Sequence, residues 1–138
     1  MKNPFIVFGI DPTFQIDLNV LTVLYRRLVT EHHPDRGGDS NTMEDINNAY
    51  RRLKDPLKRA EILLENRGVA INHEETCQDP DLLSEVFELR LNPDPSEIKR
   101  KKEIATQSFE EAFMMQDVEG MLRFYWKLMY LQKINPIS

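Results

Sequence analysis

The residues best suited to chemistry are His33, Pro34 and Asp35, which follow one another where a helix is predicted to end. Proline fixes its own backbone angle, so a loop built on Pro34 meets a partner with little loss of conformational entropy. Asp35 offers a carboxylate that a partner's arginine can hold through two hydrogen bonds, and His33 adds a ring that packs and donates one more. The tripeptide predicts a protein-binding loop. Taken alone, it also fits a simple helix stop.

Three arginines close to this tripeptide predict a positively charged face. Arg26 and Arg27 precede it by about two helical turns, and Arg36 follows it directly. Such a face steers an acidic partner toward the loop during association. The alternative interpretation is that these side chains are only a solvated surface.

No other group of residues has the spacing of a catalytic or metal site. His32 and His33 are adjacent on a helix, about 100° apart, whereas a ligating pair on one helix needs a spacing of four. The remaining histidine, His73, and the single cysteine, Cys77, fall in a segment without helical periodicity. Phosphate-binding glycine loops and nucleophile motifs are absent from the sequence. We therefore expect no enzyme activity, no metal and no cofactor.

Two helices must hold the tripeptide at their junction. Asp17 is a good N-cap, and leucines recur at three- and four-residue steps after it, which predicts an amphipathic helix to about His32. A second helix is expected from near Thr42, and Asp55 with Pro56 then caps and begins a third. The predicted buried stripe of the second helix is Met43, Ile46, Ala49, Tyr50 and Leu53.

The rest of the chain predicts three further helices, at about 80–92, 95–115 and 117–134, with Asp94 and Asp117 as caps of the last two. The expected fold class is all-α, with an antiparallel helical hairpin followed by a three-helix bundle. The predicted domain boundaries are 1–70 for the hairpin unit, 71–79 for a linker and 80–138 for the bundle.

The charge is unevenly distributed along the chain. The first 70 residues hold ten basic and ten acidic residues, and the remainder holds eight and thirteen, which gives the net charge of −5. An acidic chain is a poor match for nucleic-acid phosphates, and no stretch approaches the roughly 20 apolar residues of a membrane helix. The basic run from Lys99 to Lys102 is interpreted as a solvated turn. We expect a soluble, cytoplasmic protein that binds neither nucleic acid nor membrane.

The first helix of the bundle carries two apolar stripes, although a surface helix of a small bundle needs only one. They are Leu82, Val86 and Leu89 and, offset by one position, Leu83, Phe87 and Leu91. One interpretation is that both stripes are buried, against the first helical unit of the chain or against a second copy. The other leaves one exposed as a binding patch for another protein. Periodicity does not decide between them.

The sequence around the tripeptide resembles the J domain. The resemblance rests on His33-Pro34-Asp35 at a helix end together with four flanking segments, Phe8-Gly9-Ile10, Tyr25-Arg26-Arg27-Leu28, Asn47-Asn48-Ala49-Tyr50 and Leu53-Lys54-Asp55-Pro56. It implies that His33, Pro34 and Asp35, with the basic face beside them, contact the ATPase domain of a DnaK-type chaperone and promote ATP hydrolysis.

The resemblance extends over nearly the whole chain to the HscB co-chaperones of iron–sulfur cluster assembly. It rests on the segment from Leu53 to Leu64 and on Leu82-Leu83-Ser84-Glu85-Val86-Phe87-Glu88-Leu89-Arg90. It implies that the bundle binds the scaffold protein IscU and brings it to the chaperone HscA. The scaffold-binding residues that it implies are Leu83, Ser84, Phe87, Glu88, Arg90 and Tyr130, and Leu91 is added because it extends the same stripe.

The sequence departs from the family pattern at two of these positions. Ser84 stands where a large apolar residue is common, and Leu91 where an acidic residue is common. The chain shows no N-terminal Cys-x-x-Cys segment, which favours a bacterial type over a mature mitochondrial one. Two alternatives stay open: a J protein that serves another client through the same bundle, and a helical adaptor in which the tripeptide is incidental.

Overall fold

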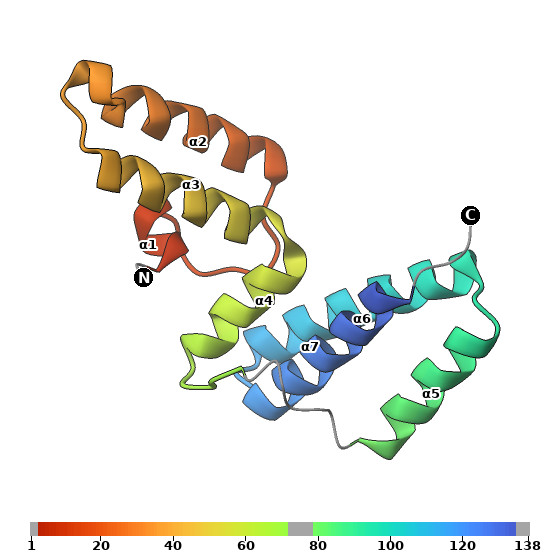
Figure 1. Ribbon diagram of the computed structural model, residues 1–138. Helices are drawn as coiled ribbons and strands as arrows, with labels where there is room; N and C mark the ends of the chain where they lie inside the picture. The colour runs from red at the N-terminus through yellow and green to blue at the C-terminus, as the bar shows by residue number, and fades with distance from the viewer. Residues whose placement is uncertain (1–2, 72–78, 135–138) are drawn as a thin grey trace. The chain divides into compact units, whose positions relative to one another are not determined.

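The computed structural model describes residues 3–71 and 79–134. Every regular element in these two ranges is a helix, which confirms the predicted all-α class (Figure 1). The chain divides into two units, Met1–Asn66 and Arg67–Ser138, each with its own internal contacts. His73 and Cys77, which the sequence places in the linker, lie outside the described residues.

The first unit is built on a helical hairpin. Helices α2 and α3 run antiparallel and pack side by side, and the short α1 packs mainly on α3 (Figure 1). Helix α4 follows α3 after a single residue and packs on it. The elements are α1 (Pro4–Phe8), α2 (Leu18–His32), the 3-10 turn η1 (Pro34–Arg36), α3 (Ser40–Lys54) and α4 (Pro56–Glu65).

Aspartate caps fix where α2, α3 and α4 begin, as predicted for α2 and α4. The Asp17 carboxylate accepts from the amides of the first turn of α2, and Asp55 does so for α4, with Pro56 at the first helical position. Helix α3 begins at Ser40, two residues before the predicted start near Thr42. The reason is Asp39, whose carboxylate accepts a hydrogen bond from the Asn41 amide.

The predicted buried stripe of α3 is correct for Ile46, Ala49 and Leu53 but wrong for Met43 and Tyr50, which are half-buried. Met43 lies at the loop end of the hairpin, in the first turn of α3. Tyr50 lies at the edge of the α2–α3 contact, where its ring stacks on Tyr25.

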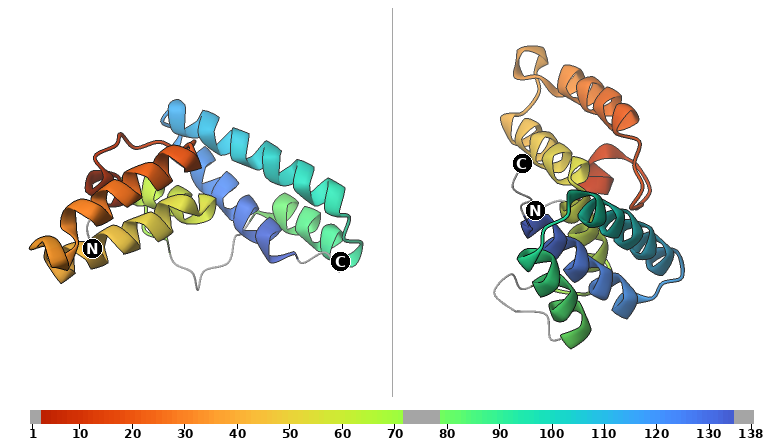
Figure 2. Two further views of the ribbon diagram at one scale, coloured as in Figure 1. Left: turned by 90° about the horizontal axis from the view of Figure 1, so that it is seen from above. Right: turned by 90° about the vertical axis from the view of Figure 1, so that its right-hand side faces the viewer.

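The second unit is the predicted three-helix bundle, and its helix boundaries agree with the sequence prediction to within one residue. The helices are α5 (Pro80–Leu91), α6 (Pro95–Met114) and α7 (Val118–Lys133). Helices α6 and α7 form an antiparallel hairpin, and α5 packs against α7 (Figure 2). Phe109, Met121, Tyr125 and Leu131 fill the core between them and are fully buried.

No helix in residues 3–71 or 79–134 is long and apolar enough to cross a membrane. Within the same ranges, no three His, Cys, Asp or Glu side chains gather closely enough to hold a metal ion.

Candidate functional site

His33 marks the point where the chain leaves α2 and enters the loop to α3. Its backbone is extended, with φ −62° and ψ 138°, so the helix ends at this residue. Pro34, which has no amide hydrogen to donate, then takes the first position of η1. The same local backbone structure therefore ends α2 and presents the tripeptide to a partner.

Three backbone hydrogen bonds close this loop. The His33 carbonyl accepts from the amides of Arg36 at 2.9 Å and Gly38 at 3.1 Å, and the Pro34 carbonyl accepts from Gly37 at 3.1 Å. The ring of His33 closes the turn, because its Nδ1 accepts from the Asp35 amide at 3.1 Å. A loop held in this way loses little entropy when a partner binds.

The accepting role of Nδ1 fixes which nitrogen of His33 can reach a partner. An imidazole nitrogen that accepts a hydrogen bond is unprotonated, so the proton of the neutral ring lies on Nε2 and is available for donation. Nδ1 also lies 3.5 Å from Oδ2 of Asp35.

Two glycines let the loop turn back toward α3. Gly37 has φ 82°, a left-handed conformation that side chains disfavour. Gly38 lies so close to the carbonyl of His32 that a Cβ atom there would overlap it. Gly37 and Gly38 thus allow the loop to pass close to the end of α2.

The predicted chaperone-binding residues all lie on the surface. The Asp35 side chain is 90% exposed and that of His33 is 47% exposed. Arg26, Arg27 and Arg36, the basic face, are exposed as well. Arg26 is seven positions, or about two helical turns, before His33, so it lies on the same face of α2 as His33.

A pair of stacked tyrosines, which the sequence did not identify as a pair, joins α2 to α3 beside the basic face. The rings of Tyr25 and Tyr50 stack at 4.1 Å between centroids. The Tyr25 hydroxyl donates to Oδ1 of Asn47, and the Tyr50 hydroxyl lies 3.2 Å from that of Thr22. These contacts fix how α2, and with it the basic face, sits on α3.

In the second unit, the structure decides between the two stripes of α5. The buried stripe, Leu82, Val86 and Leu89, is at most 7% exposed. In the exposed stripe, Leu83 is 41% exposed, Phe87 62% and Leu91 63%. Within the second unit, therefore, only the first of the two stripes is buried.

The other predicted scaffold-binding residues divide between two helices. Ser84, Glu88 and Arg90 are exposed on α5, on the side of the exposed stripe. Tyr130 is half-buried on α7, where its ring stacks on Trp126 at 6.2 Å between centroids. Six of the seven residues thus share one solvent-facing side of a single helix.

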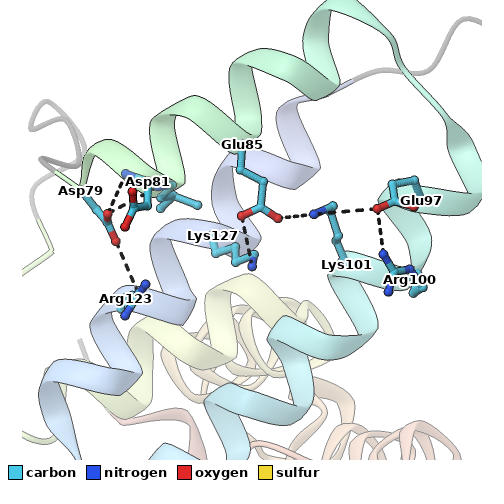
Figure 3. Close-up of polar contacts among 9 residues, drawn as sticks. Asp79, Asp81, Glu85, Glu97, Arg100, Lys101, Arg123 and Lys127 are labelled. Carbon is cyan, nitrogen blue, oxygen red and sulfur yellow. Dashed lines mark hydrogen bonds and ion pairs between the residues drawn. The ribbon is translucent and has the colours of Figure 1, made fainter.

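A network of ion pairs holds the opposite side of α5 against α6 and α7 (Figure 3). Glu85 accepts a hydrogen bond from Lys101 of α6 and lies 3.4 Å from Nζ of Lys127 of α7. Asp79, the N-cap of α5, lies 3.4 Å from Nε of Arg123. The prediction that the basic run from Lys99 to Lys102 is only solvated is wrong for Lys101, whose side chain is 22% exposed.

The charges around Glu85 decide its protonation. Burial raises the pKa of Glu85, but the hydrogen bond from Lys101 and the charges of Lys101 and Lys127 outweigh it. The net effect holds the pKa below its ordinary value of 4.5. The carboxylate is therefore ionised at neutral pH. Sequence patterns could not reveal this network, because Glu85 lies 16 residues from Lys101 and its partners belong to different helices.

The chain is similar in sequence to proteins named as HscB co-chaperone homologues. Those of Vibrio vulnificus (strain YJ016) and Aeromonas salmonicida (strain A449) are 38% and 40% identical to it over 98 residues. The matched segment is 64% of this chain and 57% of each relative, so the chain spans little more than half the length of the curated relatives it matches. No protein-family model matches the chain.

Two solved structures share the fold. The chaperone HscB from Vibrio cholerae has a TM-score of 0.76 at 26% identity, covering 96% of this chain and 92% of that one. Human co-chaperone HscB has a TM-score of 0.86 at 23% identity, covering 97% and 79%. The predicted resemblance to HscB-type co-chaperones is confirmed, together with the fold class of a J domain followed by a helical bundle. All of these relatives are named as chaperones or co-chaperones, which supports the prediction that the chain is not an enzyme.

Proposed function

We propose that this chain is a J-type co-chaperone that stimulates the ATPase of the DnaK-type chaperone HscA and delivers the iron–sulfur scaffold protein IscU to it. The observation that carries the proposal is the pairing of two exposed surfaces of different chemistry. A pre-ordered, charged loop lies in the first unit, and an apolar stripe lies in the second. Residues 1–70 act as the J domain and residues 80–138 as the scaffold-binding bundle.

The first unit docks on the ATPase domain of the chaperone. The basic face draws an acidic surface toward α2. The Asp35 carboxylate, 90% exposed, accepts hydrogen bonds from an arginine of the chaperone, while Nε2 of His33 donates one. Because the loop is already ordered, most of the energy of these contacts favours binding and the change that promotes hydrolysis.

The second unit binds the scaffold through the exposed stripe of α5. Its leucines and Phe87 provide apolar area, and Glu88 and Arg90 beside them provide polar contacts that set the orientation of the scaffold. Interfaces of this kind depend on a few buried anchors. Phe87, which is large, aromatic and 62% exposed, is the principal anchor.

The test is a single-turnover ATPase assay with purified HscA-type chaperone. Hydrolysis is measured for the chaperone alone, with this protein, with the scaffold, and with both. We expect stimulation by this protein and a further increase when both are present. In the same assay, His33→Gln should abolish the stimulation. His32→Gln is its matched control, because His32 is the neighbouring histidine but lies outside the tripeptide.

Two results would redirect the proposal. Unchanged hydrolysis in the presence of this protein would contradict the co-chaperone activity and favour a helical adaptor. Stimulation with no detectable binding of the scaffold by calorimetry would retain the J-domain function and assign the bundle to another client.

A further inference from the structure

The two apolar stripes of α5 are so similar that the hydrophobic effect does not determine which one is buried. The buried stripe has two leucines and a valine, and the exposed stripe has two leucines and a phenylalanine. Since apolar burial stabilises in proportion to area, the exposed stripe would gain at least as much by packing on α7. Another interaction must therefore select the observed rotation of α5 about its own axis.

Helix geometry shows which residues distinguish the two rotations. With about 100° per residue, the centres of the two stripes lie about 130° apart around α5. Glu85 lies on the far side of the buried stripe from the exposed one, about 70° from its centre. Turning α5 so that the exposed stripe faces α7 would point Glu85 about 160° away from the bundle, into solvent.

The observed rotation pairs charges that the alternative rotation would separate. Glu85 reaches Lys101 and Lys127 together, and Asp79 reaches Arg123 (Figure 3). The Lys101 and Lys127 side chains are only 22% and 24% exposed. In the alternative rotation both ammonium groups would lose Glu85 while partly withdrawn from water, although Glu97 would remain 3.8 Å from Lys101. Partly buried charges that lose a partner are strongly disfavoured.

We propose that Glu85, assisted by Asp79, is a positioning residue that selects which stripe of α5 faces the bundle and so keeps Leu83, Phe87 and Leu91 exposed. The ion pairs contribute specificity between two arrangements of similar apolar burial. That the exposed stripe binds a scaffold rests on the proposed function. The selection itself is a property of this chain and needs no partner.

The test measures the solvent exposure of individual methyl groups by NMR with a soluble gadolinium chelate. In the wild type, the methyls of Leu83 and Leu91 should relax much faster than those of Leu82 and Leu89. In Glu85→Lys, which sets a third positive charge beside Lys101 and Lys127, both rotations become populated and the ratio of the two rates should approach about 1. Helix content by circular dichroism should stay unchanged.

Matched variants separate selection of the rotation from loss of structure. Glu103→Lys makes the same charge change at an exposed position of α6 and should leave the ratio at its wild-type value. Lys127→Glu added to Glu85→Lys should move the ratio back toward that value. If Glu85→Lys does not fold, Glu85→Gln serves instead, because it removes the charge and preserves the shape.

The relaxation ratios of these variants decide whether Glu85 selects the rotation of α5. A wild-type ratio in folded Glu85→Lys, or in Glu85→Gln where the lysine variant does not fold, overturns the proposal. A ratio that falls with Glu85→Lys, is unaffected by Glu103→Lys and recovers in the double variant supports it. A scaffold titration on the same samples is scored separately: wild-type protein that fails to bind scaffold contradicts the proposed function and leaves the selection of the rotation standing.

Discussion

Replacing Leu83 and Phe87 by alanine should weaken scaffold binding and leave the fold almost intact. Full burial of a leucine or phenylalanine side chain contributes about 1.5–3 kcal/mol. Docking can bury only what is exposed in the free protein, 41% of Leu83 and 62% of Phe87. Together these fractions give about 1.5–3 kcal/mol, so the double variant should bind about tenfold to a hundredfold more weakly.

The effect on stability should be much smaller. Substitutions at exposed positions usually change the free energy of unfolding by about 0.5 kcal/mol or less each, and alanine is a favourable helix residue. Leu82 provides a matched control, because it is the same residue type at the adjacent position of α5 but is 4% exposed. Leu82→Ala should destabilise the bundle by about 2–5 kcal/mol, as large-to-small changes in a core do.

The assay pairs a urea unfolding curve with a calorimetric titration of scaffold on the same samples. ATPase stimulation measured without scaffold should equal that of the wild type, since the loop of the first unit is unchanged. Tyr130→Ala added to the double variant should weaken binding further if α7 contributes to the same surface. Loss of several kcal/mol of stability with wild-type scaffold affinity would place Leu83 and Phe87 in the core and refute the reasoning.

Three further predictions concern charge and protonation. His33→Gln should abolish ATPase stimulation, with helix content and melting temperature nearly unchanged; persistent stimulation, or collapse of the fold, would count against the loop as the site. Affinity for the chaperone should fall as salt rises from low ionic strength, because the basic face is exposed and screened, and a salt-independent affinity measured by titration would reduce that face to solvation. Because Lys101 and Lys127 hold the pKa of Glu85 below 4.5, its stabilising contribution should be complete above that pH and disappear as pH falls through the lowered pKa. The difference in unfolding free energy between the wild type and Glu85→Gln should therefore be constant near neutrality and shrink below pH 4.5. A difference that is the same at all pH values would show that the ionised carboxylate of Glu85 does not stabilise the bundle.

Local chemistry explains why the helices were predictable. A capping aspartate accepts hydrogen bonds from amides two or three positions away. The caps Asp17, Asp55 and Asp94 therefore predict where their helices begin from a few neighbouring residues. The one start that was misplaced, that of α3, depended on choosing Asp39 among several polar residues of the loop.

Tertiary interactions were beyond the sequence pattern. The stack of Tyr25 on Tyr50 and the bond between Glu85 and Lys101 join residues on different helices, and no periodicity records such pairs. Periodicity likewise does not show which of the two stripes of α5 is buried. Both have helical spacing, and only the arrangement of α6 and α7 shows which one faces water.

The single tryptophan of the chain gives the second unit an optical signal that the first unit lacks. Trp126 is 9% exposed in α7, with Tyr125 at 5.7 Å and Tyr130 at 6.2 Å between ring centroids. The first unit contains no indole and absorbs near 280 nm through Tyr25 and Tyr50. Fluorescence excited on the red edge of the absorption band therefore follows the unfolding of the bundle, while circular dichroism follows both units. A difference between the two midpoints would measure how independently the units unfold.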